Sequence, residues 1–110
     1  MLVLSAQDVA ASLPMKGAIE GMHRAYAACT NGDAEMPQRT VISLGAASNL
    51  AIFMPAHITG SSEVSLKSVT FSPNNEQLGL PVVQAMVQVF DVSTGTPVAL
   101  IDGGELTAIR

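Results

Sequence analysis

The sequence contains few charged residues and a single cysteine. Only 13% of its 110 residues are charged, which is about half of the roughly 25% usual for a soluble domain. One cysteine, Cys29, cannot form an internal disulfide, so a disulfide-stapled fold is excluded and a reducing cytoplasm is the expected compartment. On a helix, Cys29 is expected to be a small buried apolar side chain rather than a nucleophile.

Basic residues are also scarce. The five cations form no run or patch and the net charge is −4, so nucleic-acid binding has little electrostatic basis. No apolar stretch approaches the roughly 20 residues of a membrane span. The apolar run 2–4 is too short, and lacks the basic lead-in, of a signal peptide. We therefore expect neither nucleic acid nor a membrane as a partner.

Complete catalytic motifs are lacking as well. The nine glycines form neither a Gly-x-Gly-x-x-Gly nor a Walker loop. No Cys/His cluster has the spacing of metal ligands, and no serine lies in a nucleophile elbow. His23 and His57 stand far apart in sequence and are expected to be structural. The sequence predicts no catalytic, cofactor or metal residue set of its own.

What the sequence does contain is apolar side chains, at 48% of its residues. Its length fits one domain, residues 1–110, with one core. So few charges on so small a domain predict that apolar surface is left for something else to cover. A homodimer, a higher homo-oligomer or a further domain would each provide that cover.

The first thirty residues predict a short strand and two helices. Segment 2–4 is the strand, and Ser5 with Asp8 forms the pattern of a capping box for a helical turn or two that runs to Leu13. Pro14 suits the first position of a second helix. That helix carries an apolar face, which includes Ile19 and Tyr26, and ends at the Asn-Gly pair 31–32.

From residue 39 onward the sequence predicts a sheet. The strands are expected at 39–44, 49–57, 63–71, 82–91 and 97–102. Short turns favour antiparallel neighbours, with Gly95 left-handed in the hairpin loop 91–97 and a longer loop at 72–81. The predicted fold is α+β, in which the N-terminal strand and helices pack on a mostly antiparallel sheet of about five strands.

Alternation along two strands separates their faces. In 82–91, the face of Val83 and its i+2 neighbours is predicted to be core, and the face of Gln84 and Met86 is predicted to line a cleft. In 63–71, Lys67 shares its face with apolar residues, where an ammonium group requires an anion close by. The alternative is a lysine on an edge strand that points into water.

The sequence ends on the letters GGELTAIR. A glycine pair ends the preceding strand, Glu105 suits the first turn of a helix, and Leu106 and Ile109 share one helical face. No capping residue follows Arg110. We expect this chain to be part of a larger protein.

Several segments in order resemble the amino-terminal third of the ornithine cyclodeaminase/mu-crystallin family. The most specific are LVLSAQDV at 2–9, MPQRT at 36–40, FMPA at 53–56, LKSV at 66–69, GLPVVQ at 79–84 and LTAIR at 106–110. Shorter matches lie at 14–15, 90–91, 94–95, 97–100 and 102–103. The resemblance covers nearly the whole chain.

The resemblance implies a substrate-binding and dimerisation domain. Family members have a second, Rossmann domain that binds NAD(P), so no cofactor is expected on this chain. The resemblance further implies that Arg39, Lys67 and Arg110 bind the carboxylate of a small amino or keto acid. Bidentate guanidinium contacts and a compact ammonium suit that group. Lys16 and Arg24 remain solvated helix residues.

Two departures from the family pattern bear on the ligand. No acidic residue lies between Glu35 and Glu63, where ornithine-converting members carry one, so the resemblance does not extend to ornithine itself. His57 stands where many relatives have an aromatic residue.

Two functional hypotheses follow. In the first, the chain is a truncated relative that retains a dimerisation and carboxylate-binding half-site and lacks turnover by itself. In the second, it is a stand-alone self-associating module without ligand chemistry.

Overall fold

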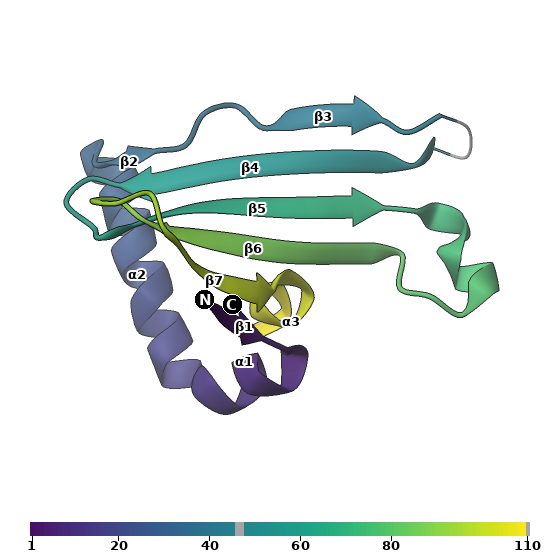
Figure 1. Ribbon diagram of the computed structural model, residues 1–110, viewed down its shortest axis with the longest axis horizontal. Helices are drawn as coiled ribbons and strands as arrows, with labels where there is room; N and C mark the ends of the chain where they lie inside the picture. Colours follow the sequence, from purple (N-terminus) through teal and green to yellow (C-terminus); the bar gives the residue numbers. More distant parts are fainter. Residues whose placement is uncertain (46–47, 110) are drawn as a thin grey trace.

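The computed structural model describes residues 1–45 and 48–109. Over these residues it contains three α-helices, one 3-10 helix and a seven-stranded sheet. In chain order the elements are β1 (Leu2–Leu4), α1 (Ala6–Ser12), α2 (Met15–Asn31), β2 (Ala34–Glu35), β3 (Thr40–Ser43), β4 (Leu50–Ile58), β5 (Glu63–Phe71), η2 (Pro73–Leu78), β6 (Val83–Asp91), β7 (Pro97–Asp102) and α3 (Gly103–Ile109). Figure 1 shows their arrangement. The α+β class is confirmed.

The sheet has more strands than the five expected. Its order is β1-β7-β6-β5-β4-β2, and β3 pairs with β4. Every pair is antiparallel except β1 with β7, which are parallel, with Leu2 opposite Ala99. The predicted N-terminal strand is therefore part of the sheet rather than packed on it. Strand β2 was not predicted because two residues are too few to show alternation.

The five predicted strands agree closely with the structure. Strands β5 and β7 have the predicted ends, and β3, β4 and β6 differ from prediction by one residue at one or both ends. Gly95 in the β6–β7 hairpin is left-handed, with φ 71°. The loop predicted at 72–81 contains the 3-10 helix η2, in which Pro73 occupies the first turn.

Local chemistry sets the ends of both N-terminal helices within a residue of the predicted positions. The Ser5 hydroxyl accepts from the Asp8 backbone N–H at 3.2 Å, and the Asp8 carboxylate accepts from the Ser5 N–H at 2.9 Å, which completes the capping box of α1. Pro14 precedes α2 as its N-cap rather than opening it. Gly32 ends α2 in the left-handed conformation with φ 77°.

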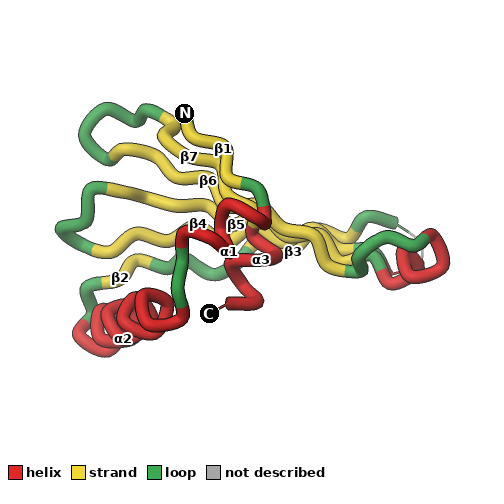
Figure 2. Tube along the Cα trace, turned by 90° about the horizontal axis from the view of Figure 1, so that it is seen from below, coloured by secondary structure: helices red, strands yellow, loops and turns green. Residues whose placement is uncertain are grey.

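All three helices lie on the same side of the sheet (Figure 2). We call this side the inner face; it carries Met54, Lys67 and Val87, which lie opposite one another on β4, β5 and β6. The other side, the outer face, carries Phe53, Ser68 and Met86 at the next register position. No helix of the described chain lies on the outer face.

The core is sparse because only one face is covered. Among the described residues, the buried hydrophobic side chains are Val9, Ala18, Ala28 and Ala51, and no large side chain is fully buried. Val83 is 53% exposed, so the prediction that its strand face is core was wrong at this end. Helix α3 covers β6 only further along, near Ala85.

Helix α2 keeps its predicted apolar face but leaves much of it open. Ile19 is 51% exposed and Tyr26 is 67% exposed, and both line an apolar groove of about 260 Å³ beside Ile109 of α3. Cys29 is exposed, which corrects the prediction of a buried thiol. The periodicity that predicts such a face does not say whether the same chain covers it. None of the described helices is both long and apolar enough to cross a membrane.

Candidate functional site

Lys67 lies in the middle of the inner face. Strand register places it opposite Met54 of β4 and Val87 of β6, and Val87 lies opposite Ile101 of β7. All four side chains are half-buried. A lysine that is half-buried in an apolar row favours an anionic or hydrogen-bonding partner for its ammonium group.

Strand β5 lies between β4 and β6 and is not an edge strand. The alternative prediction, a lysine on an edge strand that points into water, was therefore wrong. The Lys67 ammonium instead donates a hydrogen bond of 2.7 Å to the hydroxyl oxygen of Thr107 on α3. This contact joins the central strand to a helix 40 residues further along the chain.

Helix α3 reaches Lys67 because its first turn lies directly on the sheet. Gly103 is buried, and a Cβ atom there would lie 2.9 Å from the Cβ of Ala85 on β6. The Asp102 carboxylate accepts a hydrogen bond of 2.8 Å from the backbone N–H of Glu105, which caps the helix. The glycine pair and the preceding acid thus determine where Thr107 lies.

The second predicted ligand, Arg39, lies just before the start of β3. It directly precedes Thr40, the first residue of β3, and Thr40 lies opposite Phe53 of β4. Met54, the residue of β4 that follows Phe53, lies opposite Lys67. The start of β3 therefore lies two strand spacings, about 10 Å, from the part of β5 that carries Lys67. Arg39 is exposed.

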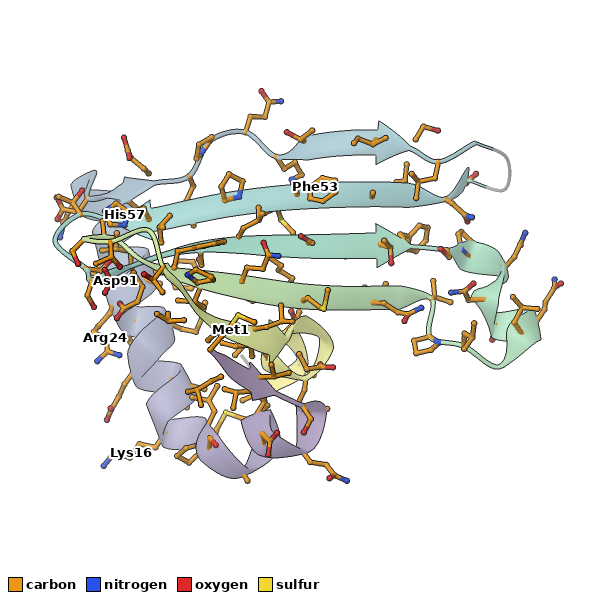
Figure 3. All side chains as sticks on the ribbon, viewed as in Figure 1. Met1, Lys16, Arg24, Phe53, His57 and Asp91 are labelled. Atoms are coloured by element: carbon orange, nitrogen blue, oxygen red, sulfur yellow. The ribbon has the colours of Figure 1, made fainter. Side chains whose placement is uncertain are left out.

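The other cations are placed differently. Lys16 and Arg24 are exposed on α2 and point away from the sheet in Figure 3, as solvated helix residues should. Arg110, the third predicted carboxylate ligand, lies outside the described residues. The structure thus places Lys67 in the apolar row and Arg39 just before β3, and it does not describe the third predicted residue.

Two aspartates elsewhere are held by local hydrogen bonds. The Ser93 hydroxyl and the Thr94 backbone N–H, which both donate to Asp91, lower the pKa of that carboxyl in the β6–β7 loop. The backbone N–H of Ser5, followed by its hydroxyl, lowers the pKa of Asp8. Both carboxylates close turns or caps and are not directed at a ligand.

The histidines were expected to be structural. Nδ1 of His57 lies 3.0 Å from the carbonyl oxygen of Glu63, across the β4–β5 hairpin, so this ring ties two strand ends together (Figure 3). His23 lines the groove between α2 and α3. Across residues 1–45 and 48–109, no three His, Cys, Asp or Glu side chains come close enough to hold a metal ion.

Sequence reasoning also predicted a cleft beside β6. Gln84 and Met86 do line a groove of about 590 Å³, together with Phe53 and Ser68 of the outer face. The residue that it missed is Thr107. Thr107 belongs to the LTAIR segment, but its contact with Lys67 joins residues 40 positions apart, and no local sequence pattern predicts such a contact.

Comparisons with known proteins agree with this architecture. Residues 1–110 match the ornithine cyclodeaminase/mu-crystallin family. The chain is 32% identical over 110 residues to a Δ1-pyrroline-2-carboxylate reductase of Bacillus cereus, covering 100% of this chain and 34% of that protein.

Two solved structures share the whole fold. The Δ1-pyrroline-2-carboxylate reductase of Thermococcus litoralis, in complex with NADH and L-proline, superposes with a TM-score of 0.93 at 36% identity, over 100% of this chain and 34% of that one. An archaeal alanine dehydrogenase dimer with bound NAD gives a TM-score of 0.91 at 28% identity, over 100% and 33%. The chain thus spans about a third of the length of these relatives, and it belongs to the ornithine cyclodeaminase/mu-crystallin family.

Proposed function

We propose that this chain is the substrate-binding domain of an NAD(P)-dependent enzyme of this family. In this proposal Arg39 and Lys67 bind the carboxylate of a small amino or keto acid. Arg110 is the third ligand of the proposal. The observation that carries it is the position of Lys67, a half-buried lysine side chain in the middle of an apolar row. The ammonium group of such a side chain can form a charge-assisted hydrogen bond with a carboxylate.

The relatives support the same class of ligand. The Thermococcus litoralis reductase was solved with L-proline, whose carboxylate is of the kind proposed here. An Arg–Lys pair suits that group because the guanidinium offers two parallel donors and the ammonium a compact charge. No acid lies between Glu35 and Glu63, so the proposal does not include a diamino acid held at both ends.

The proposal places no cofactor step on this chain. A dinucleotide site requires a glycine-rich turn between a strand and a helix, in a mainly parallel sheet. The sequence holds no such glycine pattern, and in the described part of the chain only β1 and β7 are parallel. These residues do not fit NAD(P), so turnover is not expected of the 110-residue chain alone.

Carboxylate binding is tested by titration calorimetry with L-proline and with pyruvate. Because a hydrogen bond to a charged group contributes about 1.5–3 kcal/mol, Lys67→Met and Arg39→Ala should each raise the Kd by about ten- to a hundredfold. Lys16→Ala and Arg24→Ala serve as matched controls, since they remove cations that face away from the sheet.

If the unsubstituted chain and the four variants bind with equal affinity, Arg39 and Lys67 do not belong to the binding site. NAD(P)H-linked turnover by the purified chain would contradict the proposal that this chain binds substrate but has no turnover by itself. Methionine at position 67 keeps the apolar part of the side chain in the row, so the loss of binding reports the charge and not the packing.

A second candidate function, a self-associating module, rests on the uncovered sheet. On the outer face Val3, Ile42 and Met86 are exposed, although all three are large and apolar. Surfaces of this kind mark sites of association. Sedimentation equilibrium at micromolar concentration should give a dimer or higher oligomer, whereas a monomer that binds no carboxylate would argue against both functions.

A further inference from the structure

Thr107 accepts the hydrogen bond of 2.7 Å from the Lys67 ammonium, and it does so from a different element of the fold. Lys67 lies on the central strand β5, whereas Thr107 lies on α3 and is itself exposed. The contact therefore does not fill a core. It holds the end of a flexible cationic side chain at the surface of the proposed site.

The position of Thr107 is itself fixed by the start of its helix. Gly103 lets α3 approach Ala85 to within contact distance, and the Asp102 carboxylate caps the first turn. Thr107 follows Gly103 by four positions, which is about one helical turn. The hydroxyl is thereby presented from a helix with a fixed first turn and not from a loop.

The Thr107 hydroxyl is an uncharged hydrogen-bond acceptor for the Lys67 ammonium group. A lysine ammonium has three donors, and a hydroxyl oxygen engages one of them. Because threonine is uncharged, it orients the ammonium without neutralising it. A carboxylate partner would compete with an incoming anion for that charge, whereas a hydroxyl does not.

Fixing the lysine in advance also lowers the entropic cost of binding. A free lysine side chain samples many rotamers, and ordering one such side chain on binding costs about 0.5–1.5 kcal/mol. When the hydroxyl already holds Nζ, that cost falls on folding and not on ligand association.

We propose that Thr107 is a positioning residue for Lys67, which holds the ammonium group in place to receive a carboxylate. This inference rests on the proposed function. Thr107 acts through Lys67, with no contact of its own to the ligand required.

The test compares Thr107→Val, which keeps the shape and removes the acceptor, with Thr107→Ser, which keeps the hydroxyl. Thr30→Val, at an exposed position on α2, is the matched control. NMR order parameters of the Lys67 side chain are measured without ligand, and L-proline affinity is measured by calorimetry. Backbone amide spectra show whether α3 stays on the sheet.

Thr107→Val should lower the order of the Lys67 terminus and raise the Kd for L-proline by about two- to tenfold. Thr107→Ser and Thr30→Val should leave both unchanged. A purely structural role of Thr107 would change stability without changing Lys67 order or affinity.

Two results would overturn the inference. One is a Lys67 order parameter that is the same in Thr107→Val as in the unsubstituted chain. The other is an unchanged Kd for L-proline in Thr107→Val although the Lys67 side chain has become more mobile. Failure of the proposed function gives a different pattern, in which the unsubstituted chain binds no carboxylate at all. Binding that is lost in Lys67→Met but kept in Thr107→Val refutes only the role of Thr107.

Discussion

Gly103 and Ala85 lie so close together that a Cβ atom on the glycine would be 2.9 Å from the Cβ of the alanine and 3.0 Å from its carbonyl carbon. Real Cβ atoms do not approach other atoms this closely without displacement. The glycine is therefore required by the contact between α3 and β6, and through α3 it affects Thr107 and Lys67.

Gly103→Ala should destabilise the protein and displace α3. A methyl group inserted against a backbone carbonyl is an overpacking change, which typically costs about 1–3 kcal/mol. Urea unfolding measures the loss, and a shifted Thr107 amide resonance reports the displacement. Gly21→Ala is the control, because a Cβ there meets nothing within 4 Å and should stabilise α2. Equal effects of the two substitutions would contradict the steric argument.

Asp102→Ala should weaken the start of α3. Its carboxylate accepts from the Glu105 N–H at 2.8 Å, and loss of an N-cap side chain costs about 1 kcal/mol. Asp102→Asn keeps an acceptor oxygen and should retain most of the stability. Thermal unfolding of the three proteins gives the comparison. An asparagine variant as unstable as the alanine variant would show that the acceptor is not what matters.

Acid should destabilise the protein through Asp8 and Asp91. Both carboxyls have a lowered pKa in the folded chain, so they bind protons less readily there than when unfolded. Above the ordinary aspartate pKa of about 3.9 both states are ionised and the full contribution is present. As the pH falls below that value, the unfolded chain takes up protons first, and stability is lost until the folded carboxyls titrate.

Unfolding free energies between pH 5 and pH 2.5 test this pH dependence. Asp91→Asn should flatten the curve below pH 4, because the Ser93 and Thr94 donors then face an uncharged amide at every pH. Glu20→Gln is a control on exposed α2. A variant curve parallel to the unsubstituted one would assign the acid sensitivity to other groups.

Met86→Lys should reduce self-association while leaving the fold intact. Met86 is 50% exposed in the middle of the outer face, so its replacement costs little within the chain but places a charge in any interface formed there. Sedimentation equilibrium measures the change in oligomer. Tyr26→Lys alters another exposed apolar position, on α2, and should leave the oligomer unchanged if the outer face is the contact. The reverse result would assign association to α2.

Local chemistry accounts for the part of the fold that was predictable. The Ser5–Asp8 capping box, the left-handed Gly32 and Gly95, and the ends of β5 and β7 all depend on neighbours within a few residues. Burial was less predictable, because a periodic apolar face does not specify its partner. Cys29 and Val83 are exposed for this reason.

Non-local pairing accounts for what was missed at the site. The resemblance predicted Lys67 and Arg39 as ligands, and register then placed Lys67 opposite Met54 and Thr40, the neighbour of Arg39, opposite Phe53. Thr107 could not be assigned a role from sequence, since its contact with Lys67 depends on how closely α3 approaches β6. Register and close approach are properties of the assembled sheet.

The parallel pairing of β1 with β7 affects the order in which the protein can fold. Leu2 lies 97 positions before its partner Ala99, so this pairing cannot form until synthesis has reached Ala99. Until then the N-terminal strand and the helices attached to it have no sheet edge to join. The antiparallel hairpins of β4, β5 and β6 close over shorter loops and can form earlier. Strand β1, which precedes the other strands of the described chain, is therefore among the last to join the sheet.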